Sequence, residues 1–288
     1  MEKVIIIGAG PAGISAALYA VRGNLDPLVI NNGIGALEKA EKIENYYGLE
    51  HPLSGQELYD TGIAQAKALG VRMLDAQVLG VGGFDNFVVK TTEGEFETQS
   101  LILATGSKRA APKIPGVKEF EGRGVSYCAI CDAFFYRGKD VAVLGNGDFA
   151  MHEAKELANT ASTVTIYTNG EEPEFTLEGN ISVNTMKIQS VEGDELVSGI
   201  RLAPDMQAQE TDSDTEKAVG EFCHADGLFI AMGTAGSTEI ARQMGAELTE
   251  KGNILVNENM ETTIPGLYAA GDCTGGLLQV AKAVYDGA

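Results

Sequence analysis

The sequence predicts an α/β protein made of two units of the same kind. The first observation is a strand, a glycine turn and a helix at the N-terminus, and the second is a repeat of that pattern after residue 140. The third is the glycine content, 36 residues in 288, with several glycines at junctions between strand and helix. Such junctions are typical of nucleotide-binding α/β units. A chain of this length can also form two domains.

The first unit begins with an apolar β-branched strand pattern, Val4 to Ile7. It is followed by the glycine turn Gly8-Ala9-Gly10-Pro11-Ala12-Gly13 and then by a helix pattern. In such a turn the first glycine permits the tight bend, the second lets a pyrophosphate approach, and the third lets helix and strand pack closely. The helix N-terminus then faces the phosphates. The motif therefore predicts a dinucleotide, and the alternative is a glycine turn without a ligand.

The end of the second strand lacks the usual acid. Leu28 to Ile30 is the strand pattern, and Asn31 follows it. Dinucleotide-binding units commonly carry an Asp or Glu there for a ribose hydroxyl. An asparagine can still hydrogen-bond a ribose, without the added strength of a carboxylate. Asn31 is therefore a candidate cofactor contact.

Further elements follow the same alternation. We expect a helix over 56–69, short strands over 71–90, a buried strand that starts at Leu101 and ends at Gly106, and a linker over 111–116. The second unit has a strand at 141–144, the turn Gly145-Asn146-Gly147-Asp148-Phe149-Ala150, a helix to 159 and a strand at 164–167. The acidic stretch 207–217 is expected to be a hairpin tip or loop. Later strands are expected at 227–233 and 265–272, and a helix from Val280.

Charge and hydropathy exclude several classes of partner. The net charge of −20 argues against nucleic acid or an anionic membrane. No apolar run approaches the roughly 20 residues of a membrane span. The N-terminus lacks the apolar stretch and cleavage site of a signal peptide. We therefore expect a cytoplasmic protein. The last helix ends without a basic final turn, which leaves open a longer natural tail.

One segment reverses the overall charge. The segment from Leu101 to Asp140 contains seven basic and four acidic residues, which gives it a net charge of +3. The basic residues are Lys108, Arg109, Lys113, Lys118, Arg123, Arg137 and Lys139. The segment is either ordinary surface charge or a docking patch for an acidic protein.

The cysteines predict redox chemistry. Cys128 and Cys131 form a Cys-x-x-Cys pair that can close a small disulfide ring, and Asp132 follows directly and can pass protons. One alternative is half of a zinc site, but zinc needs about four ligands and there is no second pair. The other is a pair of inert core cysteines. The three histidines have no metal-binding spacing, so no metal is expected.

The same motifs, in the same order, resemble the low-molecular-weight thioredoxin reductases across essentially the whole chain. The matching stretches are 8–13, Glu44-Asn45 followed by Gly48, Ala104-Thr105-Gly106, 128–136 and Ala270-Gly271-Asp272. The most specific is Cys-Ala-Ile-Cys-Asp-Ala-Phe-Phe-Tyr at 128–136. The family has glycine at the position of Ala133.

The resemblance implies two Rossmann-like, three-layer dinucleotide-binding domains, the second inserted into the first. The expected FAD domain spans 1–112 and 239–288, and the inserted NAD(P)H-like domain with the dithiol spans 113–238. It implies that Cys131 faces the flavin, that Cys128 exchanges with thioredoxin, and that Asp132 is the proton donor. It also implies a homodimer. The expected FAD contacts are Gly8, Gly10, Pro11, Ala12, Gly13, Asn31, Asn45, Ala104, Thr105, Gly106, Gly271, Asp272, Gln279 and Val280.

The departures from the family gather at the nucleotide site of the inserted domain. After its second strand the family has His-Arg-Arg-x-x-x-Arg, whereas this chain has Thr-Asn-Gly-Glu-Glu-Pro-Glu at 168–174. No lysine or arginine occurs from Glu156 to Met186. Phe149 stands where a small hydroxyl residue is usual, and we expect it to crowd the pyrophosphate. Because a 2′-phosphate needs a nearby arginine, NADPH is the least expected donor.

Two donors remain, ferredoxin and NADH. The chain resembles the ferredoxin-dependent flavin thioredoxin reductases, which lack pyridine-nucleotide binding, and the basic segment would suit an acidic ferredoxin or thioredoxin. For NADH, Glu171 is the nearest acid but lies beyond the Asn169-Gly170 turn. We favour ferredoxin. Two other classes stay open: a flavoprotein electron carrier that does not use the dithiol, and a non-catalytic FAD-binding scaffold.

Overall fold

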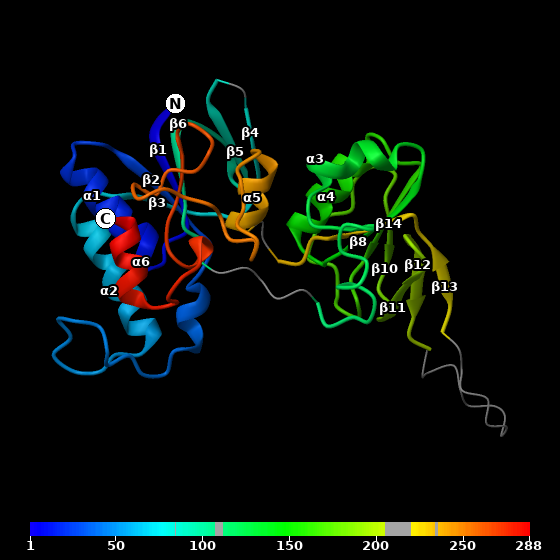
Figure 1. Cartoon of the computed structure of the whole chain (residues 1–288), viewed down its shortest axis with the longest axis horizontal. Helices are drawn as coiled ribbons and strands as arrows, with labels where there is room; N and C mark the ends of the chain where they lie inside the picture. The colour runs from blue at the N-terminus through cyan, green and yellow to red at the C-terminus, as the bar shows by residue number, and fades with distance from the viewer. Residues whose placement is uncertain (84, 107–111, 205–219, 234–235) are drawn as a thin grey trace. The chain divides into compact units, whose positions relative to one another are not determined.

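Two compact units make up the chain in the computed structural model shown in Figure 1. Unit 1 comprises residues 1–109 and 235–288, and unit 2 comprises 110–234. The predicted domain breaks lie at 112/113 and 238/239. The structure describes residues 1–83, 85–106, 112–204, 220–233 and 236–288, and only the backbone of 130 and 131. The acidic stretch 207–217, Lys108 and Arg109 lie outside these residues.

Unit 1 is built on a sheet with a parallel core. Its parallel strands run in the order β3 (Arg72–Asp75), β2 (Pro27–Asn31), β1 (Glu2–Ile7), β6 (Gly94–Leu103) and β15 (Leu267–Ala269). The first half of β6 continues into an antiparallel arm with β5 (Phe87–Thr91) and β4 (Val78–Gly82). β1 is buried from Val4 onward, as expected for a strand covered on both faces.

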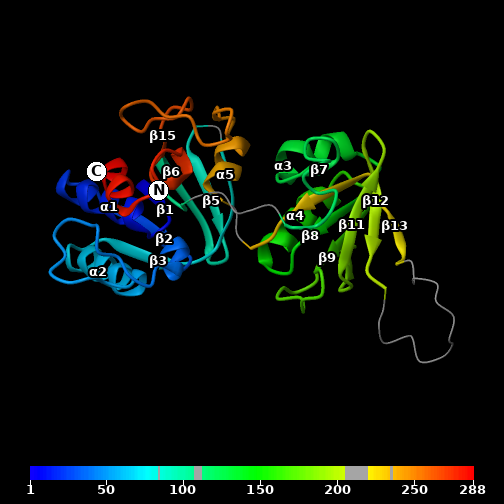
Figure 2. The ribbon, with the colours of Figure 1, turned by 60° about the horizontal axis from the view of Figure 1, so that its bottom comes forward.

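Three helices lie on the sheet of unit 1. They are α1 (Pro11–Arg22), α2 (Gly55–Ala68) and α6 (Val280–Gly287), and α1 lies beside both of the others (Figures 1 and 2). Small residues of α1 pack close against the strands, since Ala12, Ala16 and Ala17 are buried with Val4, Ile6 and Val29. α2 starts with a capping box between Ser54 and Glu57. η1 (Gly35–Lys39), α5 (Ser237–Gln243) and η3 (Asp272–Thr274) complete the unit.

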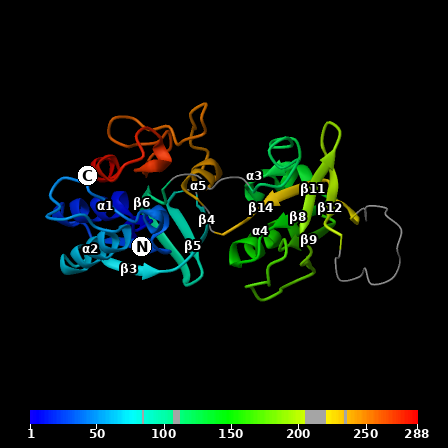
Figure 3. The ribbon, with the colours of Figure 1, turned by 90° about the horizontal axis from the view of Figure 1, so that it is seen from below.

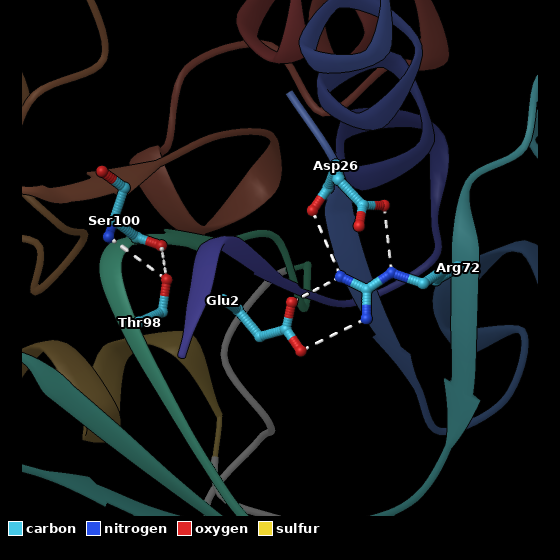
Figure 4. A network of polar contacts seen from close by, with 5 residues as sticks. All are labelled: Glu2, Asp26, Arg72, Thr98 and Ser100. Carbon is cyan, nitrogen blue, oxygen red and sulfur yellow. Dashed lines mark hydrogen bonds and ion pairs between the residues drawn. The ribbon is translucent and has the colours of Figure 1, made fainter. Parts of the chain in front are cut away.

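A network of charged groups ties the N-terminal strand to the sheet edge (Figure 4). The Arg72 guanidinium on β3 makes a two-pronged contact with the Glu2 carboxylate on β1 and donates Nε–H to Asp26 Oδ1 at 3.0 Å. Beside it, Thr98 Oγ1 accepts from the Ser100 amide and donates to its carbonyl. The Arg72 hydrogen bond lowers the pKa of Glu2.

Unit 2 has a parallel sheet and a small antiparallel sheet (Figure 3). The parallel order is β10 (Ser182–Asn184), β9 (Thr163–Tyr167), β8 (Asp140–Leu144), β14 (Gly227–Ile230) and β7 (Val125–Ser126). The antiparallel strands are β11 (Ile188–Gly193), β12 (Val197–Leu202) and β13 (Phe222–His224). α4 (Asp148–Ala158) packs on β8 and β9 and also on the short helix α3 (Ala129–Asp132), which η2 (Ala133–Tyr136) follows.

The predicted α/β class is confirmed. In each unit a glycine turn joins a parallel strand to a helix, and both helices begin earlier than predicted, at Pro11 and Asp148. The reason is that each turn ends in a glycine whose extended backbone directly precedes the helix. No helix among the described residues is long and apolar enough to cross a membrane.

Candidate functional site

The first glycine turn lies at the carboxyl edge of the parallel sheet in unit 1. There the Gly8 amide donates to Ile30, and the Ala104 amide donates to Ile7. The strand register therefore brings together the ends of β1, β2, β6 and β15, which carry the predicted contacts Gly8, Asn31, Ala104 and Gly271. The carboxyl ends of parallel strands are where ligands bind in this class of fold.

The three glycines of the first turn have different physical roles. A Cβ at Gly8 would lie 2.4 Å from the Ala104 carbonyl oxygen, and one at Gly13 would lie 1.9 Å from the Gly8 carbonyl oxygen. Both positions therefore need glycine for packing. A Cβ at Gly10 would meet nothing within 4 Å. Gly10 also begins α1 without a side-chain cap, and Pro11 follows it. Gly10 is thus the position where open space and free helix amides coincide.

Asn31 has a carboxylate neighbour that the sequence pattern did not reveal. Its Nδ2 donates to Asp75 Oδ1 at 2.8 Å, and Tyr59 donates its hydroxyl to Asn31 Oδ1 at 2.8 Å. Asp75 ends β3, and it pairs with Asn31 in the strand register. The acid missing from the end of β2 is therefore present one strand away.

The other predicted contacts of unit 1 lie in two groups. Asn45 and Gln279, far apart in the sequence, meet through a hydrogen bond of 2.9 Å from Asn45 Nδ2 to Gln279 Oε1. Gln279 precedes α6, and Val280 is its first residue. Thr105 makes hydrogen bonds with the buried Ser237 of α5, including 2.8 Å from the Ser237 amide to Thr105 Oγ1. Next to Thr105, a Cβ at Gly106 would meet nothing within 4 Å.

The turn at Gly271 and Asp272 is held by α6. Lys282 Nζ donates to the Gly271 carbonyl at 2.8 Å and pairs with Asp286 at 2.6 Å. The Asp286 carboxylate in turn accepts from the Gly271 amide at 2.9 Å. Burial raises the pKa of Asp272. Lys282 and Asp286 were not foreseen from the sequence, although their spacing of four on a helix is a recognised signal for an ion pair.

The Cys-x-x-Cys segment lies in unit 2 on the short helix α3. Cys128 precedes this helix, is 1% exposed and takes part in a disulfide, whereas Cys223 and Cys273 are free. The side chain of Cys131 lies outside the described part. Burial raises the pKa of the Cys273 thiol to about 12, so that cysteine is inert.

Ser126 links the backbone at Cys128 to Asp132. Its Oγ accepts from the Cys128 amide at 3.1 Å and donates to Asp132 Oδ2 at 2.6 Å. Ser126 is buried at the end of β7, and no sequence motif had pointed to it. The link orients the Asp132 carboxylate next to the dithiol segment.

Exposed aromatic residues follow the dithiol segment. Phe134 and Phe135 are 72% and 68% exposed, and the Arg137 guanidinium lies over the Phe134 ring, 5.6 Å from the ring centre. The Lys139 ammonium lies 5.5 Å from the Tyr136 ring centre. Large apolar groups in contact with solvent beside the Cys-x-x-Cys segment are suited to a protein partner.

The second glycine turn, in unit 2, is partly covered by the loop after β9. The Glu174 amide donates to the Asn146 carbonyl in the middle of the turn at 2.7 Å. Gly145 is needed for packing, since a Cβ there would lie 2.2 Å from the Ala231 carbonyl oxygen. Gly145 therefore has a packing reason that does not require a nucleotide, whereas a Cβ at Gly147 would meet nothing within 4 Å.

Two residues near the second glycine turn differ from what the sequence predicted. Phe149 is only 3% exposed, so it belongs to the core of unit 2, and its expected role as an obstacle to a pyrophosphate is not supported. Lys187 lies against Gly170, where a Cβ would meet the Lys187 chain at 2.8 Å. The loop after β9 thus has one lysine nearby, which directly follows the stretch from Glu156 to Met186 that lacks basic residues.

Comparisons with known proteins decide the family. The model of the pyridine nucleotide-disulphide oxidoreductases matches residues 2–287. The chain belongs to this family. The thioredoxin reductase of Aquifex aeolicus is 38% identical over 93% of this chain and 84% of its own length, and that of Bacillus subtilis is 35% identical over 99% and 90%. The predicted kinship with thioredoxin reductases is therefore confirmed.

Solved structures agree with this assignment. The atypical thioredoxin reductase TRi from Desulfovibrio vulgaris Hildenborough superposes with a TM-score of 0.88 at 38% identity, covering 100% of this chain and 94% of that one. A ferredoxin-flavin thioredoxin reductase from Clostridium acetobutylicum gives a TM-score of 0.69 at 30% identity, covering 99% and 93%. Thioredoxin reductases of this family are FAD-binding flavoproteins, and the predicted cofactor is confirmed.

The residues of unit 1 fit FAD. The open space at Gly10 and Gly106 and the uncapped amides of α1 offer room and donors for a pyrophosphate. Asn31, Asp75 and Asp272 offer hydrogen-bonding groups for the ribose and ribityl hydroxyls along the same sheet edge. The FAD contacts expected from the sequence remain predictions, and Asp75 is a further candidate contact.

Proposed function

We propose that the chain transfers electrons from ferredoxin, through FAD and the Cys128–Cys131 pair, to the disulfide of a thioredoxin. Bound FAD supplies the redox chemistry, since it can accept electrons singly and pass a pair to a disulfide. The protein's part is to hold the cofactor at the sheet edge of unit 1, and to present the dithiol on α3 and a proton-transfer group beside it.

The contact between Glu174 and Asn146 carries the proposal about the donor. It holds a segment with three exposed glutamates, Glu171, Glu172 and Glu174, at the second glycine turn. Asp148 adds an acid to the first turn of α4, where a phosphate would otherwise bind. Each missing hydrogen bond from arginine to phosphate weakens binding by about 1.5–3 kcal/mol. The single Lys187 does not offset these losses.

Two features favour ferredoxin as the donor: the positive charge of one segment and the similarity to a ferredoxin-flavin thioredoxin reductase. The segment 101–140 is net positive in a chain of net charge −20, and its described lysines Lys113, Lys118 and Lys139 are exposed. An acidic electron carrier would be steered to such a surface. The similarity to a ferredoxin-flavin thioredoxin reductase supports the same donor.

The dithiol roles follow the family resemblance. We assign Cys131 to the flavin side, Cys128 to exchange with thioredoxin, and Asp132 to proton donation. The hydrogen bond from Ser126 to Asp132 supports the last role, because it keeps the carboxylate at the dithiol segment. The burial of Cys128 means that exchange requires this thiol to become exposed in the complex with thioredoxin or after reduction.

Anaerobic stopped-flow mixing tests the donor. Reduced ferredoxin is expected to bleach the flavin of the purified protein rapidly, whereas NADPH and NADH at submillimolar concentration are expected to leave it oxidised. Fast bleaching by NADH or NADPH would contradict the ferredoxin assignment and point to an ordinary pyridine-nucleotide thioredoxin reductase.

A further inference from the structure

Glu153 is a buried acid on α4 whose place in the fold is unusual. Its side chain is 1% exposed, and Oε2 accepts the Ala129 amide at 2.6 Å. Oε1, equally buried, has no hydrogen-bond partner among the described residues. A buried carboxyl group with one oxygen left without a hydrogen bond lowers the stability of the fold, so its presence calls for an explanation.

The position of Glu153 relative to the dithiol gives that explanation. Ala129 is the first residue of α3 and follows Cys128, and α3 packs on α4. The Cys128 sulfur is four covalent bonds from the Ala129 nitrogen, so it lies within about 8 Å of Glu153 Oε2. A charge on this carboxyl therefore acts on the sulfur through the protein interior.

We propose that Glu153 is a positioning residue for the dithiol, which holds the amide beside Cys128 and opposes, by its negative charge, ionisation of the reduced cysteines. The inference rests on the proposed function in taking Cys128 and Cys131 as the redox pair. It assigns to the chain a second acid near the dithiol, distinct from Asp132.

The charge of Glu153 changes within the physiological pH range. Burial, opposed by the hydrogen bond from the Ala129 amide and helped by the negative charge of Glu156, raises the pKa of its carboxyl to about 7. The carboxyl is therefore neutral below that pH and charged above it. Other titratable groups on α4 and the elements packed against it are Cys128, Cys131 and Asp132 on or beside α3, Tyr136 on η2, Asp140 on β8, Tyr167 on β9, and Asp148, His152 and Lys155 on α4.

The charge of Glu153 is expected to affect the equilibrium between the disulfide and the dithiol form of Cys128 and Cys131. Reduction of the disulfide consumes two electrons and two protons and breaks the S–S bond to give two thiols. Above the pKa of the more acidic thiol one of these protons is released, and the thiolate stabilises the reduced form. A carboxylate within about 8 Å opposes that release, and removing its charge should strengthen thiolate formation by roughly tenfold.

The test compares the wild-type holoprotein with Glu153→Gln, which keeps an oxygen for the Ala129 amide but cannot ionise. Each is equilibrated with reduced and oxidised dithiothreitol from pH 6 to pH 9, quenched in acid, labelled under denaturing conditions and analysed by mass spectrometry at Cys128 and Cys131. We expect less than about twofold difference at pH 6, where the thiols are protonated. Near pH 9 the variant should favour the dithiol by up to roughly tenfold.

Two further variants make the result specific. Glu156→Gln removes a more exposed charge from the same helix and should leave the equilibrium within about twofold of wild type. Glu153→Asp keeps the charge, so it should retain the wild-type pH dependence even if Glu153→Gln folds poorly. Equal shifts of the equilibrium at pH 6 and pH 9 in Glu153→Gln, or none at either, would overturn the inference. A wild-type chain that forms no disulfide between these cysteines would overturn the proposed redox pair as well.

Discussion

At the scale of single residues, the three glycines of the first turn can be told apart. Gly8 and Gly13 are needed because backbone atoms occupy the space of a side chain, while Gly10 faces open space. The motif assigns the three glycines different roles, and these contacts agree with that division. The structure therefore separates a folding requirement from a binding requirement within one motif.

Gly10→Val should fold and lose FAD. Because an added side chain meets no protein atom within 4 Å, the free energy of unfolding of the apoprotein should change little. The side chain should instead block the pyrophosphate and weaken FAD binding at least roughly tenfold, about 1.4 kcal/mol. The ratio of FAD to protein after gel filtration measures this.

Gly13→Val is the matched control for this experiment. It places a side chain against the Gly8 carbonyl and should destabilise the fold by about 3 kcal/mol or more. Full FAD content in Gly10→Val would show that the cofactor binds elsewhere.

The roles proposed for Cys128 and Cys131 can be distinguished by their effect on the flavin. With Cys131 next to the flavin, Cys128→Ser should leave a Cys131 thiolate that gives a long-wavelength absorption band, and Cys131→Ser should give none. Both should lose thioredoxin reduction while they retain FAD. A band in Cys131→Ser alone would reverse the assignment.

Arg72 provides a pH-dependent contribution to stability. Arg72→Met should lower the free energy of unfolding near pH 7 by about 1 kcal/mol, since the pairs with Glu2 and Asp26 are partly exposed. The pKa of Glu2 is lowered in the folded state, so this contribution is present above the ordinary carboxyl pKa near 4.5 and is lost as the pH falls through the lowered value.

Urea unfolding at several pH values measures this effect. The difference between wild type and Arg72→Met should be constant above about pH 6 and shrink in acid. Lys42→Met, which removes a well-exposed pair with Glu44, should change stability by less than about 0.5 kcal/mol. A difference that grows towards low pH would contradict the role of Glu2.

At the scale of elements, α6 supports the turn that carries Asp272. Lys282→Met would leave the Asp286 carboxylate, only 4% exposed, without its positively charged partner and would free the Gly271 carbonyl. We expect a loss of about 3 kcal/mol in unfolding free energy and a lower FAD content. Thermal melting and flavin absorbance measure both. Lys251→Met, at an exposed position, should change neither, and a similar loss there would remove the special role of α6.

The sequence predicted the elements better than the contacts between them. Val4 to Ile7 and Val141 to Leu144 are recognisable because buried parallel strands are continuous apolar runs. The contacts of Asn31 with Asp75, of Glu153 with Ala129 and of Glu174 with Asn146 were not predictable. Each joins residues more than 20 positions apart, and only the folded sheet brings them together.

The residues around the second glycine turn could be predicted from the sequence only in part. The lost arginine motif was visible in the sequence, and the loop carries its glutamates at the glycine turn, as expected. The position of Phe149 could not be read correctly, because a phenylalanine next to a glycine turn can pack either inward or outward. Burial in the core of unit 2 decides that question.

At the scale of the whole molecule, the uneven charge predicts how donors reach the protein. Flavin reduction by ferredoxin should slow as the ionic strength rises, because salt screens attraction to the positive segment. Reversing Lys113 and Lys118 to Glu should slow this reaction several-fold without altering FAD content. Lys67→Glu, on α2 outside the segment, should have little effect. Equal rates in all variants would remove the docking role of the segment.

The central claim is that ferredoxin electrons reach thioredoxin through the dithiol. Its most direct test is anaerobic turnover, in which new thiols on thioredoxin are counted with reduced ferredoxin or NADPH as the donor, for wild type and for the Cys128→Ser and Cys131→Ser variants. Steady thiol formation with ferredoxin, none with NADPH, and none in either variant is the predicted result. Turnover with NADPH at a rate equal to that with ferredoxin, or turnover that survives in either cysteine variant, would contradict the claim.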